Sequence, residues 1–158
     1  MMKYILLTFS ILSCLALSMS AQAREVTFTT QLARYSGSGA YFAIYLLDAN
    51  NKYQQTIWVA GKKRKYYSHL RGWSRASGKR AVEYDGKTGA SVTSGRSLTI
   101  SQNIDDSLID SGYKIVIDSA VEDANSNQAD VSTPLTTAGA GKAVVGSGYV
   151  MSFTYDFK

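Results

Sequence analysis

The sequence predicts an all-β protein built as a two-sheet β-sandwich with one short helix. Tyr, Thr, Val and Ile are common, there are 13 glycines, and Pro134 is the single proline. These are residues that favour strands and the turns between them. Apolar and polar residues alternate in several short runs separated by turn signals, which is typical of strands with one buried face.

The N-terminus has the layout of a secretory signal peptide. Lys3 supplies a positive start, residues 5–19 are largely apolar, and Ala21-Gln22-Ala23 is a small-residue cleavage site. We therefore expect residues 1–23 to be removed on export to the periplasm. Residues 24–158 are then expected to form a single β-sandwich domain, since about 135 residues suit one core.

The expected strands follow in order along the mature chain. Residues 26–32 alternate between apolar and polar, which predicts a strand with one buried face. Residues 41–47 are nearly all apolar and predict a central strand covered on both faces. A turn signal at residues 48–51 leads into the next strand, at residues 53–60. The remaining strands are expected at residues 96–104, 112–121 and 149–157.

One segment departs from the strand pattern. After the basic run at residues 62–65, large apolar side chains recur at spacings of three and four, which predicts a short amphipathic helix lying on the sandwich. These side chains are Tyr66, Tyr67, Leu70 and Trp73. We expect a polar loop at residues 74–79, a short extended piece at residues 80–84, and a long loop at residues 123–140.

Composition excludes several kinds of site. The one cysteine, Cys14, lies in the expected signal peptide, so the mature chain cannot form a disulfide, a thiolate zinc site or an iron–sulfur cluster. His69 is the single histidine, and we expect no metal site. Loss of Lys3 leaves 16 basic and 12 acidic residues, a net charge of +4. An exported protein with this modest charge is not expected to bind nucleic acid.

The segment Asp85-Gly86-Lys87-Thr88-Gly89-Ala90-Ser91 matches the pattern Asp-x-x-[Ser/Thr]-Gly-Ala-[Ser/Thr]. Gly89 and Ala90 leave no bulk beside the Ser91 hydroxyl, and Gly89 can adopt backbone angles closed to other residues. The sequence offers no neighbouring base to activate this serine, so a separate enzyme would have to modify it. The alternative is an ordinary surface turn, since Asp-Gly and Thr-Gly are common turn material.

This motif resembles the flavinylation sites in the flavin-bearing subunits of sodium-pumping NADH:quinone reductases. The resemblance implies FMN attached through a phosphoester to Ser91 by an FAD-dependent FMN transferase. Asp85, Thr88, Gly89 and Ala90 would complete the recognised site. Serine stands at the acceptor position where threonine is commoner, and it keeps the hydroxyl nucleophile.

Over residues 41–157 the chain resembles the periplasmic family called domain of unknown function 2271. The resemblance is carried by the strand at 41–48, the basic and aromatic stretch at 63–73, the Asp85 motif and Gly112-Tyr113-Lys114-Ile115. That last strand is similar to one in flagellar hook-cap domains, which implies an immunoglobulin-like sandwich. Members of the family tend to accompany PepSY-type membrane proteins and flavin transferases, which implies an electron-transfer setting.

The function expected from these resemblances is that of a periplasmic electron-transfer protein, carrying FMN and working with a PepSY-type membrane reductase. It would be a flavin carrier and not an enzyme. Possible flavin neighbours are Lys63, Arg64, Tyr67, His69 and Trp73. For the possible flavin neighbours, the alternative is that the basic residues lie on a solvated loop and the aromatic residues pack in the core. For the whole chain, the alternative is a non-redox immunoglobulin-like binding or assembly module. A metal- or haem-handling accessory protein is a third and weaker alternative.

Overall fold

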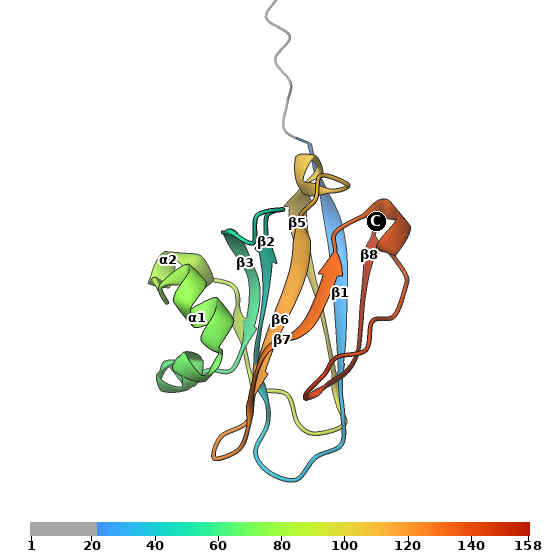
Figure 1. Ribbon diagram of the computed structural model, residues 1–158. Helices are drawn as coiled ribbons and strands as arrows, with labels where there is room; N and C mark the ends of the chain where they lie inside the picture. Colours follow the sequence, from blue (N-terminus) through green and yellow to red (C-terminus); the bar gives the residue numbers. More distant parts are fainter. Residues whose placement is uncertain (1–21) are drawn as a thin grey trace, which may run out of the picture.

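The computed structural model describes residues 22–158 (Figure 1). The predicted signal peptide lies outside the described residues, apart from Gln22 and Ala23. Ala23 is already the first residue of strand β1. No helix among residues 22–158 is long and apolar enough to cross a membrane.

Residues 22–158 form eight strands and five short helical pieces. The strands are β1 (Ala23–Leu32), β2 (Tyr41–Leu47), β3 (Tyr53–Ala60), β4 (Thr88–Gly89), β5 (Ser97–Asp105), β6 (Lys114–Ala120), β7 (Ser126–Pro134) and β8 (Val150–Phe157). The helices are α1 (Arg71–Ser77) and α2 (Ala81–Tyr84), and the 3-10 turns are η1 (Arg64–His69), η2 (Asp106–Leu108) and η3 (Thr137–Gly139).

The strands form two sheets, which confirms the predicted sandwich. One sheet has the order β5-β1-β8 and the other the order β4-β3-β2-β6-β7. All neighbours are antiparallel except β3 and β4, which run parallel. The neighbours β1–β5 and β3-β2-β6-β7 reproduce the pairings B–E and C′-C-F-G of an immunoglobulin sandwich. The last strand, β8, lies beside β1 where that fold places its first strand, A.

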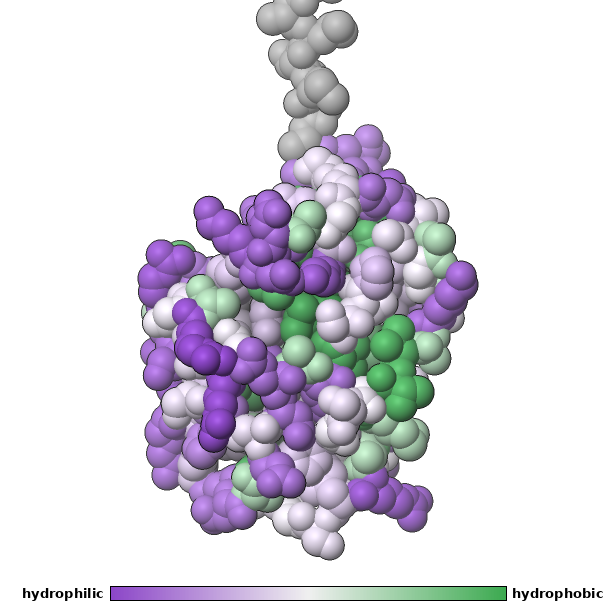
Figure 2. Space-filling model, in the orientation of Figure 1, coloured by the Kyte–Doolittle hydropathy of each residue, from purple (hydrophilic) through white to green (hydrophobic). Residues whose placement is uncertain are grey.

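The five-stranded sheet packs against other elements on both faces, and its central strand β2 is buried on both, as the apolar run at residues 41–47 predicts. Its inner face and the three-stranded sheet share the main core, which includes Phe28, Phe42, Ile44, Ile117 and Phe153. Its outer face packs under η1, α1 and α2 in a second core. That core is formed by Tyr41, Ala43, Tyr45, Val59, Tyr67, Leu70, Trp73, Tyr84, Val116 and Ala120. The helical layer covers one side of the molecule (Figure 1), and its exposed surface is mostly hydrophilic (Figure 2).

Three expected segments differ in the structure: the polar loop at residues 74–79, the extended piece at residues 80–84 and the long loop at residues 123–140. The helical region extends beyond the expected single helix, because α1 continues to Ser77, whose hydroxyl donates back to the Trp73 carbonyl at 2.7 Å. Residues 81–84 form α2 and are not extended. Residues 126–134 form β7, an edge strand whose polar side chains and bulge disguise the strand pattern.

The bulge in β7 lies opposite a buried aspartate, Asp118, on β6. The pairing changes register between Ile117 and Ser119, and Ala129 takes a φ of 49° there. The Asp118 carboxylate accepts from the Tyr45 hydroxyl at 3.1 Å and from the backbone N–H groups of Trp73 and Ala129, both at 2.9 Å. Burial, and then the charge of Asp118, raise the pKa of Tyr45. One carboxylate thereby joins β2, β7 and helix α1.

Replacing this carboxylate should cost more than an ordinary surface change. We expect Asp118→Ala to lower the free energy of unfolding by about 3 kcal/mol, because three donors lose their buried partner. Chemical denaturation followed by circular dichroism measures the change. The matched control is Asp156→Ala at an exposed position of β8, expected to change stability by less than about 0.5 kcal/mol. Equal effects of the two substitutions would contradict the role given to Asp118.

Candidate functional site

The Asp85–Ser91 motif lies in the connection that leaves the helical layer and crosses to the three-stranded sheet, at the lower end of the molecule (Figure 1). Asp85 ends α2, with its N–H donating to the Ala81 carbonyl at 2.8 Å. Gly86 then turns the chain with a φ of 75°, a conformation that suits glycine. The next residues, Thr88 and Gly89, form β4 and pair with Val59 and Ala60 of β3.

Gly89 is required here by a close contact and not by its backbone angle. Its φ lies outside the left-handed region that favours glycine, which corrects the expectation from the sequence. A Cβ at this position would lie 2.9 Å from Cζ2 of Trp58. The Trp58 ring is half-buried against the main core, and its indole N–H has no hydrogen-bond partner among the described residues. The motif therefore packs directly on a tryptophan of β3.

Ser91 is exposed, as the motif requires of an acceptor. Hydrogen bonds hold the backbone on both sides of it. On one side the Gly61 N–H donates to the Gly89 carbonyl at 2.8 Å, and on the other Ala40 and Val92 exchange bonds of 2.8 and 3.0 Å. The segment is therefore not a free loop, because it is paired with β3 and with the residues before β2.

Ser91 is exposed, and the described residues around its hydroxyl offer no activating group. A Cβ on Gly39 would lie 2.9 Å from Ser91 Oγ, so this glycine leaves room beside the hydroxyl. Among residues 22–158, no side chain exchanges a hydrogen bond with Ser91 Oγ, and none is placed to act as its general base. A group added here would extend outward, and its attachment would depend on another enzyme's chemistry.

Of the predicted flavin neighbours, Arg64 is the one that an ion pair joins to the motif. Its guanidinium lies 3.3 Å from an Asp85 carboxylate oxygen and 5.1 Å from the centre of the Tyr84 ring. Lys63 and His69 are exposed and lie near the Tyr66 ring, at 5.9 Å for the Lys63 ammonium and 6.2 Å for the His69 ring. Arg64 and His69 thus lie on η1, and Lys63 lies directly before it.

Tyr67 and Trp73 lie inside the second core, which fits their interpretation as packing residues. The Tyr67 hydroxyl donates to the Gly61 carbonyl at 2.7 Å, and burial raises the pKa of Tyr67. The Trp73 indole donates to the Thr56 hydroxyl at 2.8 Å, and its side chain is fully buried. Neither ring presents a face on which a flavin could stack without opening the helical layer.

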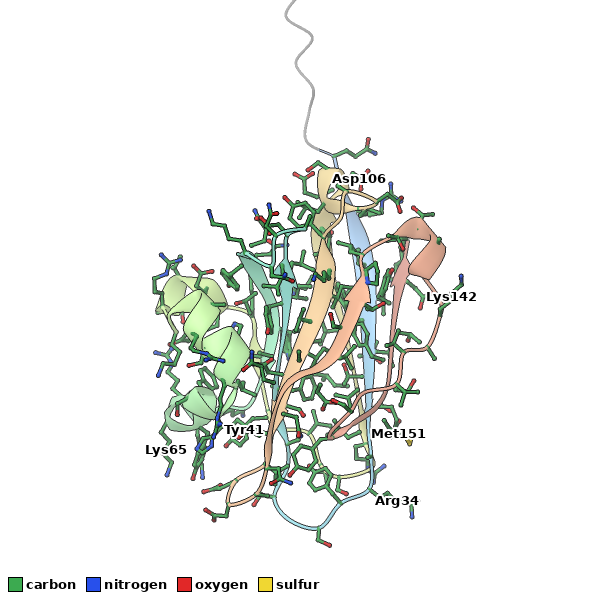
Figure 3. All side chains as sticks on the ribbon, in the orientation of Figure 1. Arg34, Tyr41, Lys65, Asp106, Lys142 and Met151 are labelled. Carbon is green, nitrogen blue, oxygen red and sulfur yellow. The ribbon has the colours of Figure 1, made fainter. Side chains whose placement is uncertain are left out.

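Three features beside the motif could not be predicted from the sequence alone. The alternating pattern places Trp58 in the strand at residues 53–60, and no pattern singles out Gly39. Arg34 and Arg96 lie in two segments that are hydrogen-bonded to each other beyond Ser91. Arg34 lies at the same end of the molecule as Tyr41 and Lys65 (Figure 3). These contacts join residues that lie from about thirty to about sixty positions apart in the chain, so local periodicity carries no signal for them.

The described residues form several open hollows. One is an open groove of about 620 Å³ beside Arg34, and another of about 330 Å³ lies between α1 and β7. Within the described part of the chain, no group of three His, Cys, Asp or Glu residues could hold a metal ion.

The fold is an immunoglobulin-like two-sheet sandwich with a helical layer on one sheet, and Ser91 is exposed on it. Residues 23–152 match the family described as predicted periplasmic protein (DUF2271), and the chain belongs to that family. The family description places the protein in the periplasm, in agreement with the export signal expected from the sequence. No curated protein and no solved structure matches the chain.

The contact between Gly89 and Trp58 can be tested by a double-mutant cycle. We expect Gly89→Ala to lower the free energy of unfolding by about 1–3 kcal/mol, because a methyl group must displace the indole ring. In a Trp58→Leu background the same substitution should cost much less, since the ring is gone. Urea denaturation of the four proteins measures the coupling. Additive effects would show that the ring does not set the requirement for glycine.

Proposed function

We propose that the protein is a periplasmic electron-transfer protein that carries FMN covalently on Ser91. The observation that supports this most directly is the position of Ser91, which is exposed, flanked by Gly39 and Ala90, and held by paired backbone on both sides. The motif resemblance supplies the chemistry, and the periplasmic family supplies the compartment. Bound FMN supplies transfer of one or two electrons.

The residues around Ser91 are compatible with such a group. The space beside the Ser91 hydroxyl, which a Cβ on Gly39 would fill, leaves the oxygen free to bond a phosphorus atom. Transfer from FAD would form the Ser91 Oγ–phosphorus bond, break the FAD pyrophosphate bond and release AMP. Because no base lies beside Ser91 among residues 22–158, an FAD-dependent FMN transferase would have to supply it. Asp85, Thr88, Gly89 and Ala90 would form the site that the transferase recognises.

In this proposal the chain is a carrier and not an enzyme. A PepSY-type membrane reductase would exchange electrons with the flavin on the periplasmic side. Arg64, paired with Asp85, is the basic side chain that the ion pair brings to the motif. Lys63 is exposed just before η1, and together with Arg64 it would favour an anionic reduced flavin close to this surface. His69 is an exposed neighbour on η1.

A non-redox binding or assembly module is the second candidate. The observation that favours it is the pairing of Thr88 and Gly89 with β3, together with the contact between Gly89 and Trp58. These contacts give the motif a structural use that needs no cofactor. The two candidates differ in one respect that can be measured directly, the covalent state of Ser91.

Co-expression with an FMN transferase from the same organism tests the proposal. We expect the intact mass of the exported protein to rise by one FMN less one water, with a yellow fluorescent band on a denaturing gel. Ser91→Ala should abolish the added mass, because the nucleophilic oxygen is lost. Ser91→Thr should keep it, because threonine retains the hydroxyl.

Thr88→Ala is the matched control, since it removes the other hydroxyl of the motif at an exposed position. We expect FMN to remain attached in this variant, at a yield that reports on recognition. An unmodified mass in the presence of a transferase that is active on its own substrate would contradict the flavin proposal and favour the non-redox binding or assembly module. Loss of FMN from Thr88→Ala with full retention in Ser91→Ala would move the site to Thr88.

A further inference from the structure

The open groove of about 620 Å³ lies beyond Ser91, where residues 33–35 meet residues 94–96. Its lining consists of Arg34, Tyr35, Ser94, Gly95 and Arg96. Both arginine side chains are exposed, and neither forms an ion pair or side-chain hydrogen bond with another residue of the described range 22–158. Two guanidinium groups thus line one hollow without a carboxylate to neutralise them.

The backbone beneath the two arginines is fixed by hydrogen bonds. The Leu32 N–H donates to the Arg96 carbonyl at 2.9 Å, and the Gly95 N–H donates to the Ala33 carbonyl at 3.0 Å. The Ser94 hydroxyl accepts from the Tyr35 N–H and donates to the Tyr35 carbonyl, both at 2.7 Å. These bonds use the one donor of the Ser94 hydroxyl, so the charged donors of the groove are the two guanidinium groups.

Gly95 allows the Arg34 side chain to lie across the turn. Its φ is +71°, and a Cβ there would be 3.2 Å from Arg34 Cγ. Arg34 also lies at the opposite end of the molecule from Asp106 (Figure 3), and Asp106 is paired with Arg24 at 2.7 Å. The acidic residues near η2 therefore do not serve as partners of the groove.

We propose that the groove between Arg34 and Arg96 binds the phosphate group of a small ligand. A guanidinium offers a planar fork of N–H donors that matches phosphate oxygens and stays charged at all physiological pH values. Two such groups match the charge of a phosphate dianion better than that of a single carboxylate, which has one charge and two oxygens. The proposal does not depend on FMN at Ser91.

Titration with inorganic phosphate, followed by ¹H–¹⁵N NMR at constant ionic strength, tests the site. The mature protein carries Ser91→Ala, so covalent flavin has no part in the result. We expect saturable shifts confined to the amides of residues 33–36 and 93–97. In the double variant R34Q/R96Q the affinity should fall at least about tenfold, since both charged partners are lost.

The matched control is R71Q/R75Q, which removes the same charge from exposed arginines on α1 that line a separate small hollow. We expect it to bind phosphate within about twofold of the parent. Single variants R34Q and R96Q, each expected to weaken binding severalfold, serve if the double variant does not fold. Equal weakening in both double variants, or shifts scattered over the surface, would overturn the proposal in favour of general attraction to a basic protein.

Discussion

The buried carboxylate of Asp118 is the contact on which the layered arrangement depends. It accepts from Tyr45 on β2, from Ala129 in the β7 bulge and from the start of α1 at Trp73. A buried carboxylate is stable only where donors replace water, so these three segments must assemble together. Gly72 is part of the same constraint, because a Cβ there would lie 2.9 Å from Asp118 Oδ2. The helical layer is thus joined to the sheet by a polar contact as well as by the second core.

Fixing the helical layer also fixes the chain that leaves it. With α1 and α2 lying on the outer face, the connection must return along the edge of β3, where Thr88 and Gly89 add a short parallel strand. It then crosses to β5, pairing with Ala40 through Val92 on the way. Ser91 lies between these two hydrogen-bonded points and is exposed. Ser91 is therefore held at the surface because the connection pairs with the edge of the larger sheet before it crosses to β5.

Sequence patterns predicted those parts of the fold whose periodicity is local. The double burial of β2 follows directly from the apolar run at residues 41–47, and the sandwich follows from the alternating strands. β7 was missed because a polar edge strand with a bulge loses its alternation around Ala129. The motif alone was enough to single out Ser91 as the candidate acceptor, and its exposed position agrees with that role. Trp58 could not be placed beneath Gly89, because that contact depends on a parallel pairing between segments about thirty residues apart.

The motif belongs to the hydrogen-bonded β framework and holds Ser91 at its surface. Native-state hydrogen exchange of the backbone amides tests this arrangement most directly. The Gly61, Val92 and Ala40 amides, which donate across the motif, should exchange at rates close to those of the amides paired between β2 and β6. Exchange of these three amides at the rate of unprotected loop amides would show that the motif is a free loop and would contradict the account.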